Sequence, residues 1–225
     1  MLFPERDVDR PLARFPIVLV LLITANIIVF LMELALGNDF IMRYSLKPAE
    51  IVRGEHLETL FTSMFMHANF LHIFGNMLYL WVFGDELEAN YLGPVRFLVF
   101  YFICGLAASF LQIAVNPTST VPNLGASGAI AGVLGAFLIV FPQDRILVYI
   151  FPFWQASLTA VVLIGFWFIF QLVNGFGSIT ALNTAQGGTA YFAHIGGFIA
   201  GVVLVKLFGA GVPPDDEQEY PRLRR

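Results

Sequence analysis

A single serine lies among glycines and alanines in the stretch VPNLGASGAIAGVLGAF, residues 121–137. Ser127 falls at the expected start of an apolar helix, and a serine hydroxyl becomes a good nucleophile only when a neighbouring base takes its proton. Histidine titrates nearest neutral pH, so His194, in the stretch AHIGGFIAG, is the candidate base. The alternative is that Ser127 only packs helices together, as small residues do in membrane proteins.

The composition indicates which elements must position these side chains. Charged residues make up 12% of the 225 residues and hydrophobic residues 58%, whereas soluble domains carry about 25% charge. We therefore expect an all-α, polytopic membrane protein with six transmembrane helices. Residues 146–153, which contain Pro152, are expected to approach the fifth helix along the membrane interface. The six apolar segments are 15–36, 60–83, 97–115, 127–141, 157–173 and 190–208.

The charged residues lie mainly at the chain ends and between the apolar segments. Residues 1–14 are expected to be a cytoplasmic segment, residues 15–208 the membrane domain, and residues 209–225 a disordered cytoplasmic tail. Nine Lys and Arg residues fall on the side of both termini and three on the other side. This asymmetry predicts an inner (plasma) membrane protein with both termini cytoplasmic and an active site that opens to the outer side.

Polar side chains inside the apolar segments are candidates for function. At about 1.5 Å per residue, Ser127 lies about 21 Å above the inner end of its segment, and His194 and His72 lie about 18 Å above theirs. The three side chains therefore share one layer, and Asn76 lies one turn below His72 on the same helix face. The fourth segment has only 15 residues, so we expect its helix to begin inside the membrane, below a cavity that holds water.

This layer could perform acyl transfer. Ser127 is expected at the first helical position, where free N–H groups and the positive end of the helix dipole favour an oxyanion. His72 and Asn76 could add side-chain donors to the same oxyanion. No Asp or Glu occurs in the third to sixth segments, so the sequence predicts a Ser–His dyad rather than a triad.

Glycines with a spacing of four residues are expected to bring the fourth and sixth helices together. Such small-xxx-small faces allow two helix backbones to approach closely. Close approach would also carry Ser127 to His194, so the packing and the catalytic interpretations are compatible. The glycines are Gly128, Gly132, Gly197 and Gly201.

Three stretches, HANFLHIFGNMLYLWVFGDELE, GASGAIAGVLGAF and AHIGGFIAG, resemble signatures of the rhomboid intramembrane serine proteases. The resemblance covers roughly residues 15–208. It implies that Ser127 is the nucleophile and His194 its general base. It also implies that His72 and Asn76, with the backbone of Ser127, stabilise the oxyanion.

The resemblance has further implications for the site and its partners. It places His67 at the mouth of the cavity, where we also expect Gly125 and Gly128, and it implies a structural role for Glu88. It implies cleavage of a single-span membrane protein in or next to its transmembrane segment. The expected partners are therefore that substrate and the lipid bilayer, with no nucleic acid, no cofactor and no metal. The single Cys104 offers neither a disulfide framework nor a thiolate metal site.

Two positions depart from the rhomboid pattern. Members often carry Trp-Arg where this chain has Glu58-Thr59, and some carry a Tyr, stacked on the catalytic histidine, where this chain has Ala131. Phe192 or an aromatic side chain of the fifth helix would then have to restrain His194.

Two other functions remain open from the sequence. One is a catalytically silent rhomboid-like protein that binds transmembrane clients, although such proteins usually lack the serine or the histidine. The other is a small transporter with a histidine proton relay. It is disfavoured because the chain shows no inverted repeat and no acidic residue paired with the histidines.

Overall fold

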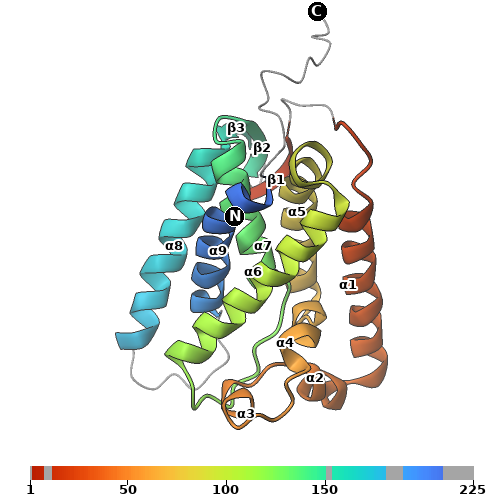
Figure 1. Cartoon of the computed structure of the whole chain (residues 1–225), viewed down its shortest axis with the longest axis vertical. Coiled ribbons are helices and arrows are strands. Elements are labelled where there is room, and N and C mark those ends of the chain that lie inside the picture. The colour runs from red at the N-terminus through yellow and green to blue at the C-terminus, as the bar shows by residue number, and fades with distance from the viewer. Residues whose placement is uncertain (1, 8–11, 151–153, 181–189, 210–225) are drawn as a thin grey trace, which may run out of the picture.

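The computed structural model describes residues 2–7, 12–150, 154–180 and 190–209, and within them six helices of 14 to 22 residues form a bundle (Figure 1). Shorter helices lie at one end of the bundle: α2 (Asn38–Tyr44), α3 (Pro48–Val52) and α4 (Thr59–Thr62), followed by the 3-10 helix η1 (Ser63–Phe65). The bundle helices are α1 (Ile17–Leu36), α5 (Phe70–Glu86), α6 (Pro94–Val115), α7 (Ser127–Val140), α8 (Ala160–Thr180) and α9 (Tyr191–Phe208).

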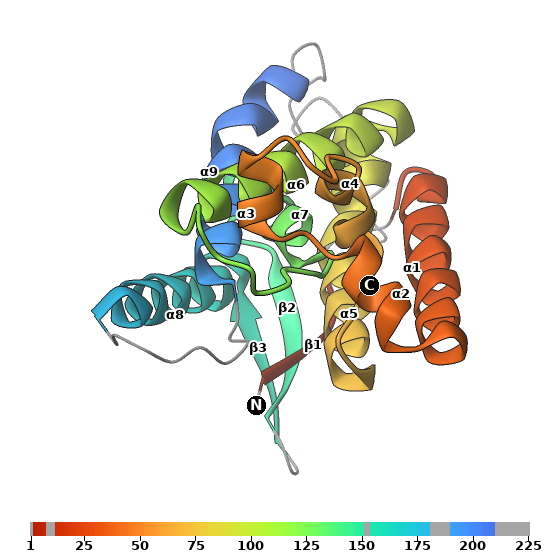
Figure 2. The same cartoon turned by 90° about the horizontal axis from the view of Figure 1, so that it is seen from below.

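Helix α7 is the centre of the bundle, and α1 and α8 lie at its periphery (Figure 2). All residues of α7 from Gly128 to Phe137 are buried. A Cβ atom added to Gly197 would overlap the carbonyl oxygen of Gly128, and one added to Gly201 would overlap the carbonyl oxygen of Gly132. Helices α7 and α9 therefore meet backbone to backbone, at the four glycines that the sequence singled out.

Two helix starts differ from the expected segments. Helix α5 begins at Phe70, ten residues after the apolar segment begins, because the side chain of Asn69 accepts a hydrogen bond from the His72 backbone N–H at 2.9 Å and caps the helix there. Helix α8 begins at Ala160 rather than at residue 157, because the preceding residues belong to a strand.

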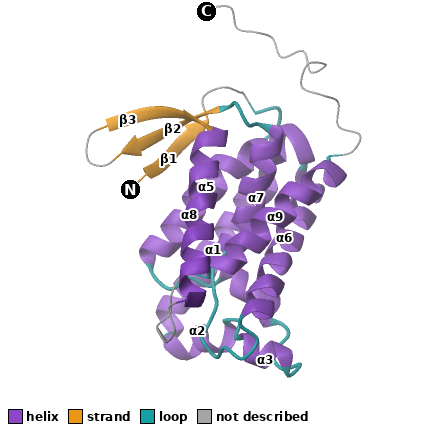
Figure 3. Cartoon of the chain, turned by 90° about the vertical axis from the view of Figure 1, so that its left-hand side faces the viewer, coloured by secondary structure: helices purple, strands orange, loops and turns teal. Residues whose placement is uncertain are grey.

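The expectation of an all-α fold is wrong, because β1 (Leu2–Asp7), β2 (Arg145–Ile150) and β3 (Trp154–Thr159) form an antiparallel sheet in the order β1-β2-β3. In β2, Ile146 and Val148 are buried while Arg145 and Tyr149 are exposed, which is the two-residue period of a strand. The sheet lies at the end of the bundle opposite α2 and α3 (Figure 3), where its edges need not face lipid.

The predicted interfacial segment and chain ends are described only in part. Strand β2 replaces the interfacial approach expected over residues 146–153, and residues 151–153 lie outside the described residues. The same is true of residues 1 and 8–11 of the predicted N-terminal segment, and of residues 210–225 of the predicted tail.

Among the described residues, three helices are long and apolar enough to cross a membrane: Ile17–Leu36, Pro94–Val115 and Tyr191–Phe208. Helix α7 and residues 160–175 are apolar but shorter. The fold is thus mostly helical with three candidate spans.

The first helix is anchored by a carboxylate from the π-helical turn η2 (Leu87–Leu92), which follows α5. The two oxygens of Glu88 accept hydrogen bonds from the backbone N–H groups of Val18, at 3.0 Å, and Leu19, at 2.7 Å. Glu88 is fully buried, and it satisfies two N–H groups that lack partners within the first turn of a helix.

Candidate active site

The segment before α7 is held in place by backbone hydrogen bonds to the first connection. Leu46 and Asn123 exchange two such bonds, of 2.9 and 2.7 Å, and the N–H of Gly125 donates to the carbonyl oxygen of Ser63 at 2.8 Å. Gly125 has a φ of +126°, which L side chains rarely adopt. These contacts fix the point at which α7 begins, and its first residue is Ser127.

Ser127 and His194 form a hydrogen-bonded pair. The Oγ atom of Ser127, on α7, lies 2.8 Å from Nε2 of His194, on α9. His194 is 9% exposed, so little water competes for this bond. The pair has the geometry that a nucleophile and its general base require, a separation of about 2.6 to 3.2 Å.

Two residues of α8 contact the other parts of the His194 ring. The Oε1 atom of Gln171 lies 2.9 Å from Nδ1 of His194, and the ring centroid of Trp167 lies 5.8 Å from that of His194. Trp167 is thus an aromatic residue of α8 that lies beside the histidine. A glutamine inside an apolar segment, one turn after a tryptophan, was the available sequence signal; a search confined to ionisable residues misses it.

His72 and Asn76 line the same cavity as Ser127 and His194. The backbone N–H of Ala68 donates to Nδ1 of His72 at 3.3 Å, so the neutral ring carries its proton on Nε2. A Cβ atom on Gly125 would lie 2.9 Å from that Nε2 atom, which places the imidazole against the turn before Ser127. The Nδ2 atom of Asn76 is buried and has no hydrogen-bond partner among the described residues. Both side chains thus offer N–H donors near Ser127.

His67 packs against His72 and is not among the described residues that line the cavity. Its side chain is buried, its ring centroid is 5.1 Å from that of His72, and it does not belong to the cavity lining. The backbone N–H of His67 donates to Oε1 of Glu33 at 2.8 Å. Glu33 therefore links the segment just before α5 to α1.

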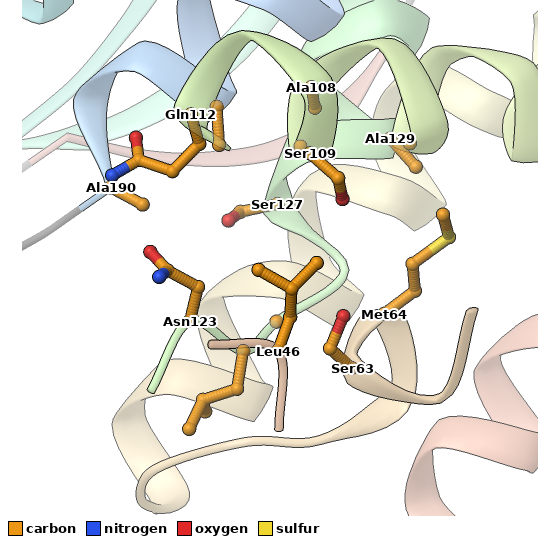
Figure 4. A pocket seen from close by; sticks show the side chains of 15 residues that line it. Leu46, Ser63, Met64, Ala108, Ser109, Gln112, Asn123, Ser127, Ala129 and Ala190 are labelled. Carbon is orange, nitrogen blue, oxygen red and sulfur yellow. The ribbon is translucent and has the colours of Figure 1, made fainter. Parts of the chain in front are cut away.

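A large cavity and a small pocket meet at Ser127. The cavity has a volume of about 1000 Å³ and is lined by residues of α2, α5, α7, α8 and α9 and of the segment before α7. The pocket has a volume of about 40 Å³, enough for more than one water molecule. Figure 4 shows the Ser127 side chain at this pocket, between Ser109 and Gln112 of α6 and Asn123 of the preceding segment. Gly125 and Gly128 line the pocket rather than the large cavity.

Glu58, one of the two residues that stand at the expected Trp-Arg positions, forms an ion pair. The Nη1 atom of Arg43 lies 2.7 Å from Oε1 of Glu58, and this hydrogen bond holds the pKa of Glu58 below its usual range. Thr59 donates its hydroxyl to the carbonyl oxygen of His56. Within the described part of the chain, no three His, Cys, Asp or Glu side chains group as metal ligands would.

The Rhomboid domain profile matches residues 54–211, which include Ser127, His194, His72, Asn76 and Gln171. The chain belongs to the rhomboid family. This rhomboid is 33% identical over 191 residues to "Rhomboid protein 1, mitochondrial" of Saccharomyces cerevisiae, a match that covers 81% of this chain and 50% of the yeast protein.

Two further relatives are similar over most of this chain. "Presenilin-associated rhomboid-like protein, mitochondrial" of Homo sapiens is 29% identical over 191 residues, which is 80% of this chain and 45% of the human protein. "RHOMBOID-like protein 1" of Arabidopsis thaliana is 32% identical over 167 residues, which is 73% of this chain and 38% of the plant protein. This rhomboid thus spans at most about half the length of these relatives.

The names of the relatives bear on the cellular location. The yeast and human proteins are named mitochondrial, as is "RHOMBOID-like protein 6, mitochondrial" of Arabidopsis thaliana. The prediction of a plasma membrane with cytoplasmic termini and an outward-facing site is therefore wrong. It rested on the distribution of Lys and Arg, which distinguishes the two sides of a membrane but not one membrane from another.

Proposed function

We propose that this rhomboid is an intramembrane serine endopeptidase that cleaves single-span membrane proteins in or next to their transmembrane segment. The observation that carries the proposal is the 2.8 Å contact between Ser127 Oγ and His194 Nε2 beside a large cavity between helices. Membership of the rhomboid family supports it. The proposed location is a mitochondrial membrane.

In the first half of the reaction, Nε2 of His194 takes the proton of the Ser127 hydroxyl as Oγ attacks the carbonyl carbon of the substrate. The N–H groups of the first turn of α7 have no partner within the helix and face the oxyanion with the side-chain donors of His72 and Asn76. When the tetrahedral intermediate collapses, His194 returns its proton to the leaving amine, and an acyl-enzyme ester on Ser127 remains.

In the second half, water hydrolyses this ester. Nε2 of His194 takes a proton from the water as its oxygen attacks the ester carbonyl, and Ser127 leaves with that proton. The pocket of about 40 Å³ beside Ser127 can hold such water near the ester. Its polar lining from Ser109, Gln112 and Asn123 supplies hydrogen-bond partners.

The proposed architecture is a domain over residues 15–208 with six spans, formed by α1 and α5 to α9. In this arrangement the short α7, of 14 residues, begins inside the membrane, and the segment before it reaches down to that depth. The burial of α7 supports this placement, since its surroundings are protein rather than lipid.

The test is cleavage by the purified full chain of a labelled single-span protein in liposomes, with Ser127→Ala and His194→Ala as inactive variants. Ser157→Ala, an exposed serine on β3, is the matched control and should cleave as the wild type does. A fluorophosphonate should label the wild type but not Ser127→Ala. Equal cleavage by wild type and Ser127→Ala would overturn the proposed role of Ser127. Cleavage by neither protein across several substrates would favour the silent client-binding protein.

A further inference from the structure

Helix α8 presents two side chains to the catalytic histidine from one face. Trp167 and Gln171 are four residues apart, so they lie one turn apart on the same side of the helix. Trp167 packs beside the imidazole, and Gln171 contacts its Nδ1 atom. The ring is therefore contacted by α8 on one side and by Ser127 of α7 on the other.

The contact with Gln171 has a chemical consequence for the ring. Neutral imidazole has one proton for two nitrogens, so only one of them can donate. The carbonyl oxygen of the Gln171 amide, Oε1, faces Nδ1 at 2.9 Å and accepts only from a protonated nitrogen. When the proton is on Nδ1, Nε2 has a free lone pair directed at the hydroxyl of Ser127, 2.8 Å away.

We infer that Gln171 is a positioning residue that holds His194 in the Nδ1–H tautomer, the form in which Nε2 can act as a base. This inference rests on the proposed function. The side chain of Gln171 is only 5% exposed. A neutral amide can be buried there at a lower desolvation cost than an ionised carboxylate. Gln171 thus takes the part that a carboxylate takes in a Ser–His–Asp triad.

The inference also links the position of α8 to the chemistry. Ser127 and His194 lie on α7 and α9, which meet through their backbones, whereas Gln171 reaches the ring from the peripheral helix α8. A displacement of α8 by about 1 Å would lengthen the contact beyond hydrogen-bonding distance. His194 is therefore held in the Nδ1–H tautomer only while α8 is packed against α9.

The test reads the tautomer directly. In wild-type protein with ¹⁵N-labelled histidine, the His194 signals, assigned by their loss in His194→Ala, should show a protonated Nδ1 and an unprotonated Nε2. Gln171→Met keeps the length of the side chain but removes the acceptor. It should shift the ring towards the Nε2–H form, which neutral imidazole favours in water.

Cleavage kinetics provide a second readout. Gln171→Met should lower kcat by about 10-fold or more, with an upper limit of about 10⁴-fold, the most that general base catalysis contributes. KM should stay within about twofold of wild type. In Gln171→Glu the protonated carboxyl group can donate its O–H to Nδ1, whereas the ionised carboxylate only accepts from Nδ1–H. Its kcat should therefore rise with pH along a limb that the wild type lacks. Gln143→Leu, an exposed glutamine outside the helices, is the control and should change neither readout.

The outcomes separate the two proposals. An Nε2–H tautomer in the wild type, or an unchanged tautomer and kcat in Gln171→Met, overturns the inference about Gln171. The expected tautomers in a protein that cleaves no substrate would support the inference about the ring and overturn the proposed function instead.

Discussion

Adding one methyl group at Gly197 tests whether the contact between α7 and α9 sets the geometry of the site. A Cβ atom there would overlap the carbonyl oxygen of Gly128, the residue after Ser127. A backbone atom cannot move aside as a flexible side chain can, so the two helices must separate by on the order of 1 Å. Overpacking of this kind costs about 1 to 3 kcal/mol, so Gly197→Ala should lower the free energy of unfolding by that amount.

The same displacement should lower activity. Ser127 Oγ and His194 Nε2 are 2.8 Å apart, and a further 1 Å of separation takes them beyond the hydrogen-bond limit of about 3.2 Å. Loss of general base catalysis should then reduce kcat by about 100-fold or more.

Unfolding in mixed micelles and cleavage of a labelled substrate would measure the two effects. Gly165→Ala on α8 is the matched control, because a Cβ atom there has no neighbour within 4 Å. That variant should keep full activity, and removing a helix-interior glycine should leave its stability equal or up to about 1 kcal/mol higher. A Gly197→Ala protein as stable and active as Gly165→Ala would refute the reasoning from backbone contact.

Two further predictions concern single side chains. Asn76→Ala removes an oxyanion donor, so it should lower kcat by about 10²- to 10³-fold while the thermal midpoint of unfolding stays near that of the wild type. An unchanged kcat would exclude Asn76 from the oxyanion site. Glu88→Gln should lower the free energy of unfolding by about 1 to 3 kcal/mol, since an amide can accept only one of the two buried N–H bonds from α1. Arg43→Ala, which breaks an exposed ion pair, is its control, and equal unfolding of the two variants would contradict the anchoring role of Glu88.

The helix boundaries were predictable from the sequence where the length of the apolar segment alone determines them. The segments at 15–36, 97–115 and 190–208 agree with α1, α6 and α9 to within three residues at either end, because each is one uninterrupted apolar run. The start of α5 was not predictable from hydropathy, since the apolar run begins ten residues earlier and the cap at Asn69 decides the boundary. The sheet was missed for a related reason: Arg145–Ile150 is apolar enough to suggest a membrane approach, and its partner β1 is distant in sequence.

The candidate site was predictable as far as residue type and depth allow. Counting residues puts Ser127, His194 and His72 in one layer with Asn76 one turn below, and the structure brings all four to one cavity. Depth does not determine the direction of a side chain, so counting residues could not show that His67 packs against His72 outside the cavity lining. Gln171 was missed because its role depends on the rotation of α8 about its axis, which a uniformly apolar helix does not reveal.

The backbone contact between α7 and α9 has a consequence for how this rhomboid would respond to its bilayer. Helix bundles adapt to thicker or thinner membranes mainly by tilting their helices. Two helices whose main chains touch can tilt only together, so the separation of Ser127 and His194 would stay nearly constant. The peripheral helices α1 and α8 would instead tilt to match the changed bilayer thickness. Lipid composition would therefore alter the hydrogen bond from α8 to His194 before it altered the contact between Ser127 and His194.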